Sequence, residues 1–257
     1  AATGELPGPP PQGPSPAVTS GPAAQSTSTR TARVIALDPG HGGPEPGAVN
    51  AQMGLSEADL NLDIALRTAD LLRASGYVVV LTRDSDRAVD PTYRGGGYAG
   101  GVGRDLQARI DIANSAEADL FISIHNNGSA NPEHSGTEVW YSAQRSFSER
   151  NQALAEIALD TLVGAIRDAG HWTVRRGILE DSNFRTFRGR IFNIYVLGPG
   201  DSPTRPHVPT QMPGILGETL FLSNAADAAA LSRPAVRQAI AGGYLAAIER
   251  YFERFPD

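Results

Sequence analysis

Hydrophobic and polar residues alternate along the chain in blocks that predict strands and helices in turn. Short runs rich in Val, Ile, Leu and aromatic residues predict strands at 33–38, 77–82, 119–124, 137–141, 191–197 and 215–221. Apolar residues with a period near 3.6 predict helices at about 56–74, 105–117, 148–168 and 234–254. We therefore expect an α/β fold, with a single domain built on a mostly parallel or mixed sheet of about six strands and helices on both faces.

The first 31 residues lack this alternation. They consist mainly of Pro, Gly, Ser and Thr, with little charge. Such a composition buries too little apolar surface to offset the entropy of ordering the chain. We expect residues 1–31 to form a disordered tether and residues 32–257 to form the folded domain. Because the chain begins with Ala and has no Cys, we also expect an exported protein, located in the periplasm, the cell wall or outside the cell, whose signal peptide has been removed.

The composition excludes several classes of function. The net charge is −6, with 28 acidic and 22 basic residues, so a basic nucleic-acid-binding surface is not expected. No apolar run approaches the roughly 18 residues that a transmembrane segment needs. The absence of Cys excludes disulfides, iron–sulfur clusters and Cys nucleophiles. All basic residues are Arg, which excludes a Walker A phosphate loop and Schiff-base chemistry through Lys.

Two of the five histidines follow predicted strands directly. His41 lies in LDPGHGG after the first strand, and His125 follows LFISI at the end of the third. Sites in open α/β sheets form outside the carboxyl ends of strands, so the two imidazoles can meet at one edge. Glu57 is a third candidate, because Ser56 is placed to cap a helix that follows the first strand. Two imidazoles and one carboxylate are a catalytic zinc set, and they suit Zn²⁺ better than Mg²⁺ or Ca²⁺.

Each of these residues also has a purely structural interpretation. Either histidine could pack or hydrogen-bond within its loop, and Glu57 could do no more than interact with the helix dipole. Glu218 lies in the otherwise apolar run GILGETLF, where a lone carboxylate is costly unless it is paired or functional. It is therefore either the general base for a metal-activated water or the salt-bridge partner of a nearby Arg.

Other polar signals favour ordinary structural roles. The remaining histidines are expected in surface loops: His134, His171 and His207. The run GGGYAG at 95–100 matches G-x-G-x-x-G, but it does not follow a strand as the dinucleotide-binding fingerprint requires, so we expect a flexible loop. The chain has no G-x-S-x-G nucleophile elbow, which disfavours a serine hydrolase.

Six motifs occur in a set order along most of the chain: IALDPGHGG at 35–43, EADLNL at 57–62, GYVVVLTRDSD at 76–86, RIDIANSAEADLFISIHNN at 109–127, GTEVWY at 136–141 and ETLFLSN at 218–224. Together they resemble the zinc-dependent N-acetylmuramoyl-L-alanine amidases of the amidase-3 type, over about residues 33–254. The resemblance implies that residues 32–257 are a zinc amidase catalytic domain. It implies zinc ligands at His41, Glu57 and His125, and a catalytic glutamate at Glu218. The reasoning from the residues singles out the same four.

The resemblance also implies a function. A peptidoglycan amidase cleaves the amide between N-acetylmuramic acid and the L-alanine of the stem peptide, so peptidoglycan and its muropeptides are the expected partners and Zn²⁺ the expected cofactor. We expect a monomer, and we take Asn127 as a candidate substrate contact. Arg83 and Glu138 resemble positions near the site, with a salt bridge or a strand-surface role as the alternative. Two other functions remain open: a non-catalytic peptidoglycan-binding regulator, and a zinc peptidase or deacetylase that acts on another amide.

Overall fold

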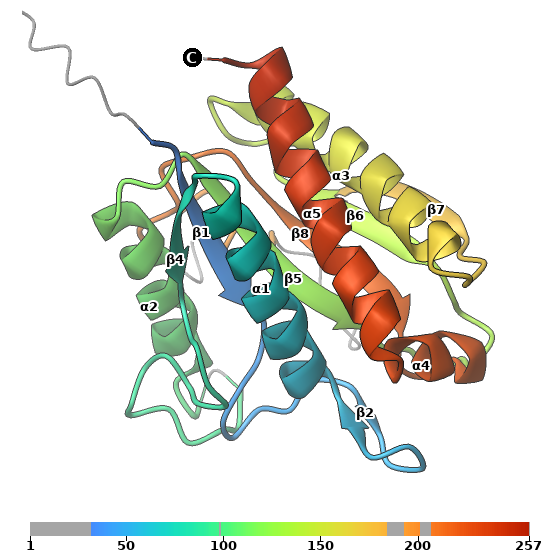
Figure 1. The fold of residues 1–257 in the computed structure, drawn as a ribbon. Helices are drawn as coiled ribbons and strands as arrows, with labels where there is room; N and C mark the ends of the chain where they lie inside the picture. Colours follow the sequence, from blue (N-terminus) through green and yellow to red (C-terminus); the bar gives the residue numbers. More distant parts are fainter. Residues whose placement is uncertain (1–31, 98, 184–192, 201–206, 257) are drawn as a thin grey trace, which may run out of the picture. The chain divides into compact units, whose positions relative to one another are not determined.

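One six-stranded mixed sheet organises the domain. The computed structural model describes residues 32–97, 99–183, 193–200 and 207–256. In spatial order the strands are β4 (Val78–Leu81), β1 (Val34–Pro39), β5 (Leu120–Asn127), β8 (Gly214–Phe221), β6 (Thr137–Tyr141) and β7 (Arg175–Glu180). All neighbouring pairs are parallel except β6 and β8, which are antiparallel. The expected α/β fold is confirmed, including its mixed sheet and its number of strands (Figure 1).

Helices cover both faces of this sheet. Within the described residues, the helices are α1 (Glu57–Ala74), α2 (Val102–Ser115), α3 (Ser148–Asp168), α4 (Ala225–Leu231), α5 (Pro234–Arg254) and a single 3₁₀ turn, η1 (Asp181–Asn183). Helices α1, α3 and α5 pack on one face through a core that includes Ile35 and Leu37, whereas α2 packs on the other face against Ala36 and Phe121. Successive residues of β1 thus point to opposite faces, as the pleat requires.

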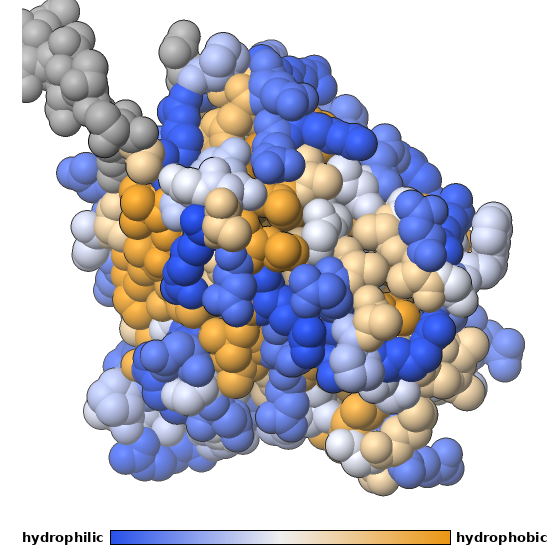
Figure 2. Space-filling model, in the orientation of Figure 1, coloured by the Kyte–Doolittle hydropathy of each residue, from blue (hydrophilic) through white to orange (hydrophobic). Residues whose placement is uncertain are grey.

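The exposed sides of the helices are mostly polar. Asp70 and Arg73 of α1 and Arg250 of α5 face the solvent. Figure 2 shows the resulting mixture of hydrophilic and hydrophobic surface on the side that α1 and α5 present in Figure 1. No helix within the described ranges is both long enough and apolar enough to cross a membrane. The tether expected at residues 1–31 lies outside the described residues.

One predicted strand is wrong, and one strand of the six-stranded sheet was missed, as was the short hairpin at 49–56. Residues 193–197 form a turn, and residues 191–192 lie outside the described part of the chain. Their apolar side chains, Val196 and Leu197, are buried as an irregular segment in the core under α2. The sixth strand is instead β7, an edge strand whose sequence RRGILE mixes charged and apolar residues. The apolar residues of the irregular segment are there because they are buried in the core. β7, in contrast, is a strand because its backbone pairs with β6.

The topology brings the candidate site residues to one edge. Because β1, β5 and β8 are parallel, their carboxyl ends lie together. His125 and Glu218 are direct partners in the β5–β8 register, and His41 follows β1. A short hairpin, β2 (Val49–Asn50) with β3 (Leu55–Ser56), then returns the chain to the start of α1 at Glu57. The Ser56 side chain caps this helix by accepting a hydrogen bond from the Asp59 amide, as expected.

Candidate metal centre

The turn after β1 places His41 against α1 and β5. His41 has a φ of 62°, a left-handed conformation that non-glycine residues seldom adopt. Two buried arginines hold this turn. Arg83 donates to the carbonyls of Pro39 and Gly40, at 2.9 Å each, and Arg109 donates to the carbonyl of His41 at 2.7 Å. The strained backbone that presents His41 is therefore fixed by charge-assisted hydrogen bonds.

Two glycines make room for the ligands. A side chain at Gly40 would overlap the imidazole of His125. Gly47 has a φ of 67°, and a Cβ there would lie 2.5 Å from Glu57 Oε2 and 2.7 Å from His41 Cδ2. These two positions need glycine because backbone and ligand side chains approach one another closely.

Three candidate ligands converge on one point. Glu57 Oε1 lies 3.0 Å from His41 Nε2 and 3.0 Å from His125 Nδ1. One donor atom from each residue lies within 4.8 Å of the others, and the two imidazoles meet edge to face. Ligands of a tetrahedral zinc ion lie about 3.3–3.5 Å apart, given bonds of about 2.0–2.2 Å. The chemistry and the spacing of this donor set therefore fit a zinc ion.

Backbone and side-chain partners orient these ligands. Nδ1 of His41 donates to the Glu45 carboxylate, and the Ala48 amide donates to Glu57 Oε2 at 2.9 Å. A carboxylate that holds the far nitrogen of a metal-binding histidine is a common feature of metal sites. The sequence reasoning did not identify Glu45. The available signal was a carboxylate four residues after His41 in the same loop.

Opposite charges dominate the electrostatics of the ligand set. Burial lowers the pKa of His41, but the charge of Glu57 and hydrogen bonds to Glu45 and Glu57 outweigh it and raise the pKa to about 10. Burial raises the pKa of Glu57, but the charge of His41 and hydrogen bonds to both histidines bring it well below the usual 4.5. The site thus favours positive charge beside Glu57, and a divalent ion must displace a proton to bind.

Glu218 lies beside this cluster, and no ion pair to it is found among the described residues. It is half-buried in β8, and its Oε2 is buried with no hydrogen-bond partner among the described residues. Burial, together with the charges of Glu57 and Glu138, raises the pKa of Glu218 well above 4.5. Within the described ranges no arginine pairs with Glu218, so the salt-bridge alternative is not supported. A carboxyl group with a raised pKa beside a cation site is placed for proton transfer.

Asn127 and Glu138 lie in the open cleft that contains this cluster. The cleft has a volume of about 820 Å³ and is lined by His41, Glu57, Asn127, Glu138, Glu218 and others. Asn127 Nδ2 donates to Glu138 at 3.0 Å, and Arg176 pairs with the same carboxylate at 2.6 Å. Glu138 thus has the salt bridge that was its structural alternative, and it lies in the cleft as well.

The residues assigned to ordinary roles have more varied surroundings than expected. His134 is exposed in a loop, as predicted. His171 is only partly exposed and pairs with Asp227 at 2.8 Å, which ties its loop to α4. His207 stacks on Tyr195 with ring centroids 4.0 Å apart. Arg83 is fully buried and has no salt bridge within the described part of the chain, so neither structural alternative is supported, whereas its hydrogen bonds to Pro39 and Gly40 place it near the site.

Comparison with known proteins agrees with this site. The sequence model of the N-acetylmuramoyl-L-alanine amidase family Amidase_3 matches residues 35–250. The germination-specific N-acetylmuramoyl-L-alanine amidase of Bacillus subtilis (strain 168) is 33% identical over 220 residues, or 86% of this chain and 80% of that protein. The amidase AmiC of Neisseria meningitidis serogroup B is 29% identical over 255 residues, or 89% of this chain and 56% of that protein.

A solved structure extends the comparison to the fold. The catalytic domain of CwlV, an N-acetylmuramoyl-L-alanine amidase from Bacillus (Paenibacillus) polymyxa var. colistinus, matches with a TM-score of 0.65 at 27% identity. The match covers 86% of this chain and 98% of that domain. Fold and site together define a peptidoglycan hydrolase. The chain belongs to the family of N-acetylmuramoyl-L-alanine amidases, which cleave the amide between N-acetylmuramic acid and L-alanine.

Proposed function

We propose that His41, Glu57 and His125 hold a catalytic zinc ion and that Glu218 is the general base. When bound, zinc supplies a Lewis acid that polarises the amide carbonyl and lowers the pKa of a water molecule to about 7. Glu218 takes the proton of that water and passes it to the nitrogen of L-alanine as the amide bond breaks. The buried Oε2 of Glu218, which has no hydrogen-bond partner among the described residues, is free to take and return this proton.

One observation supports this assignment above the others. The same oxygen of Glu57 lies 3.0 Å from nitrogens of both histidines, while the buried Oε2 of Glu218 has no hydrogen-bond partner in the part of the chain that the structure describes. A buried carboxyl oxygen without a hydrogen bond is costly in a purely structural role. In an active site, the carboxyl oxygen of Glu218 gains a hydrogen-bond partner when water or substrate binds, which offsets this cost.

The cleft provides for the rest of the substrate. Asn127 of β5, Glu138 of β6 and Arg176 of β7 form a row that runs across the strands beside Glu218, and we assign this row to contacts with the stem peptide. Asn127 is already engaged with Glu138 and with the Gly128 amide, so it acts within a fixed hydrogen-bonded row. We further propose that the protein acts as an exported monomer on the cell wall.

Substitution of Glu218 tests the proposal. We expect Glu218→Gln to reduce kcat about 10²- to 10⁴-fold, because the amide cannot accept the proton of water. Bound zinc, measured by mass spectrometry of the metal, should stay near that of the wild type. The control is Glu249→Gln on the outer side of α5, which should leave the rate unchanged. Cleavage of purified muropeptides by Glu218→Gln at the wild-type rate would show that Glu218 is not the base.

Product analysis separates the amidase from its alternatives. The amidase releases stem peptides with a free L-alanine amine, and a deacetylase would release acetate instead. A regulator that only binds peptidoglycan would release neither product. Mass spectrometry of digested muropeptides distinguishes the three outcomes in one experiment.

A further inference from the structure

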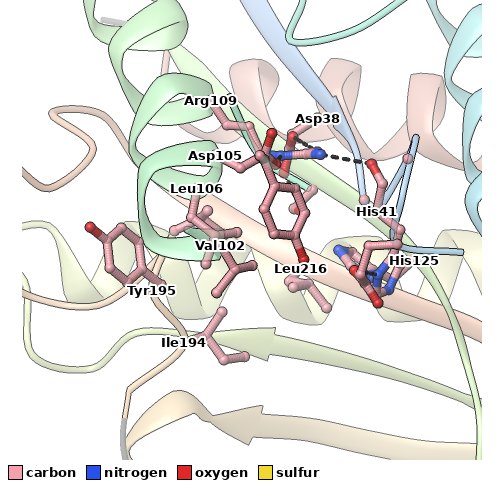
Figure 3. A pocket seen from close by; sticks show the side chains of 16 residues that line it. Asp38, His41, Val102, Asp105, Leu106, Arg109, His125, Ile194, Tyr195 and Leu216 are labelled. Atoms are coloured by element: carbon pink, nitrogen blue, oxygen red, sulfur yellow. Dashed lines mark hydrogen bonds and ion pairs between the residues drawn. The ribbon is translucent and has the colours of Figure 1, made fainter. Parts of the chain in front are cut away.

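A second cavity opens on the other side of the metal ligands. It has a volume of about 250 Å³ and lies on the face of the sheet covered by α2. His41 and Glu45 line both this cavity and the open cleft. Figure 3 shows His41 and His125 at one side of the cavity, with Val102, Leu106, Ile194 and Tyr195 across from them. The volume corresponds to about eight water molecules, which is enough for a small chemical group next to the metal.

The walls of the cavity are mainly apolar, with one unpaired hydroxyl. Val102 and Leu106 come from α2, Ile194 from the segment before β8, and Leu216 from β8 itself. Tyr93 also lines the cavity and is only 3% exposed, yet its hydroxyl is buried without a hydrogen-bond partner among the described residues. An unpaired buried hydroxyl costs free energy unless a ligand completes its hydrogen bond.

The charges at the cavity favour a neutral ligand. Among the described residues, Asp38 and Asp105 both pair with Arg109, at 2.9 and 3.0 Å, and Glu45 adds a third carboxylate. Three carboxylates and one arginine thus line this cavity. Carboxylates of a stem peptide are repelled from this space, whereas an uncharged group can enter.

The glycine-rich loop at 95–101 lies between two residues of the cavity wall, Tyr93 and Val102. Gly95, Gly97 and Gly101 have positive φ values of 85°, 65° and 98°, and the loop connects Tyr93 to the start of α2 at Val102. The backbone thereby turns sharply enough to place both side chains at the same cavity. The loop, expected only to be flexible, thus joins two of the residues that line the cavity.

We propose that this cavity is a subsite for the neutral N-acetylated sugar of the substrate, with the Tyr93 hydroxyl donating to the carbonyl of its acetamido group. The acetamido methyl then packs against the apolar walls from α2 and β8. This proposal rests on the proposed function, because it assumes that the substrate is cleaved at the metal, with its sugar on one side of the metal and its stem peptide on the other. The acetamido group of the uncharged sugar enters the cavity, and the charged stem peptide lies in the open cleft. Neither Tyr93 nor the cavity takes part in the bond-breaking step.

Tyr93→Phe tests the proposal with a matched pair of substrates. One is a muropeptide with an N-acetylated muramoyl residue, and the other is the same compound with a free amine on that sugar. We expect Tyr93→Phe to raise KM about 3- to 10-fold for the acetylated substrate and to leave kcat and bound zinc unchanged. KM for the de-N-acetylated substrate should not change. Tyr77→Phe, which alters a tyrosine stacked on Phe252 far from the cavity, is the control.

Three outcomes would overturn the proposal. Tyr93→Phe could leave KM for the acetylated substrate unchanged, or change KM equally for both substrates.

The third outcome concerns binding without catalysis. The methyl amide of N-acetylmuramic acid, which is uncharged, is titrated into the wild type and followed by saturation-transfer NMR. It should show its strongest signal at the acetamido methyl, and Val102→Phe should abolish that signal by filling the cavity. Absence of the methyl signal in the wild type contradicts the subsite even if the muropeptides are cleaved. If the signal is present but no muropeptide is cleaved, the proposed function fails and the binding site stands.

Discussion

At the scale of single residues, neighbouring groups of the protein orient two of the proposed metal ligands, His41 and Glu57. Glu45 holds the far nitrogen of His41, and the Ala48 amide holds the far oxygen of Glu57. Ligands fixed in this way lose little side-chain entropy when the metal binds, and their donor atoms stay aimed at one point. The metal site therefore depends on residues that do not touch the metal.

Glu45→Gln measures this dependence. We expect the affinity for zinc to fall about 10- to 100-fold, because the neutral amide orients His41 less firmly and no longer balances its charge. The midpoint of thermal unfolding without metal should change little, since Glu45 lies in a partly exposed loop. Competition with a zinc-binding dye gives the affinity. The control is Asp70→Asn, on an exposed part of α1, and an affinity equal to that of the wild type in Glu45→Gln would remove the proposed role.

Some residues of the site could be predicted from the sequence and others could not. His41, His125 and Glu218 stand out because each interrupts or follows an apolar strand, and Glu57 stands next to a capping serine. Glu45 lies between prolines in an irregular loop, where no periodicity marks it. The role of Tyr93 depends on a cavity, and a cavity is a property of packing rather than of sequence order.

At the scale of elements, β8 joins the catalytic edge to the core. Glu218 points toward the cleft, while its neighbour Gly217 meets α5 on the opposite face. A Cβ at position 217 would overlap the hydroxyl of Tyr244, which is fully buried. The position of Glu218 is therefore set in part by how closely α5 packs on β8.

Gly217→Ala tests this contact. We expect it to lower the free energy of unfolding by about 1–3 kcal/mol, because the added methyl overpacks the interface. Combining it with Tyr244→Phe should recover part of the loss, since the overlapping hydroxyl is removed. Gly242→Ala in α5 has open space at its Cβ and should instead stabilise by roughly 0.5–1 kcal/mol. Urea denaturation measures all three, and equal losses in Gly217→Ala and the double variant would contradict the packing argument.

The elements differ in how well their sequences predict them. Buried strands such as β1 and β5 have continuous apolar runs, and long helices such as α3 show clear periodicity, so these were predicted within a few residues. The edge strand β7 has mixed polarity, with exposed Arg175 and Arg176 beside partly buried Ile178 and Leu179, and nothing local marks it as a strand. The short helix α4 and the β2–β3 hairpin are too brief to show a period.

At the scale of the whole molecule, a buried ionic network connects the sheet to α2 beneath the site. Asp38 accepts hydrogen bonds from Thr82 at 2.7 Å, Ser123 at 2.8 Å and Arg109 at 2.9 Å. Figure 3 shows Arg109 reaching from this carboxylate to the carbonyl of His41. The stability of the fold and the position of a metal ligand therefore depend on the same arginine.

This network predicts how stability depends on pH. Burial raises the pKa of Asp38, but the charge of Arg109 and the hydrogen bonds from Thr82 and Ser123 outweigh it and hold the pKa below the usual 3.8. Because the folded-state pKa is lowered, the stabilisation is fully present above about pH 4 and is lost as the pH falls through the folded-state value. Asp38→Asn should lose about 3–5 kcal/mol at pH 7, because Arg109 keeps only one of its two carboxylate partners.

The same variant should then lose less additional stability between pH 4 and pH 2 than the wild type does. Urea denaturation across this range measures the difference, with Asp70→Asn as a surface control. An identical pH dependence in Asp38→Asn and the wild type would show that this carboxylate does not link protonation to folding.

Zinc titration of the metal-free protein tests the central claim most directly. The metal is removed with a chelator, zinc is added back in steps, and mass spectrometry follows the stem peptides released from purified muropeptides. We predict that cleavage is absent without zinc, rises in proportion to the zinc added, and reaches its plateau at one ion per chain, with a free L-alanine amine on every product. His41→Ala should show no such recovery, although its circular dichroism matches that of the wild type. Full cleavage by the zinc-free protein, or a different bond cut, would contradict the account.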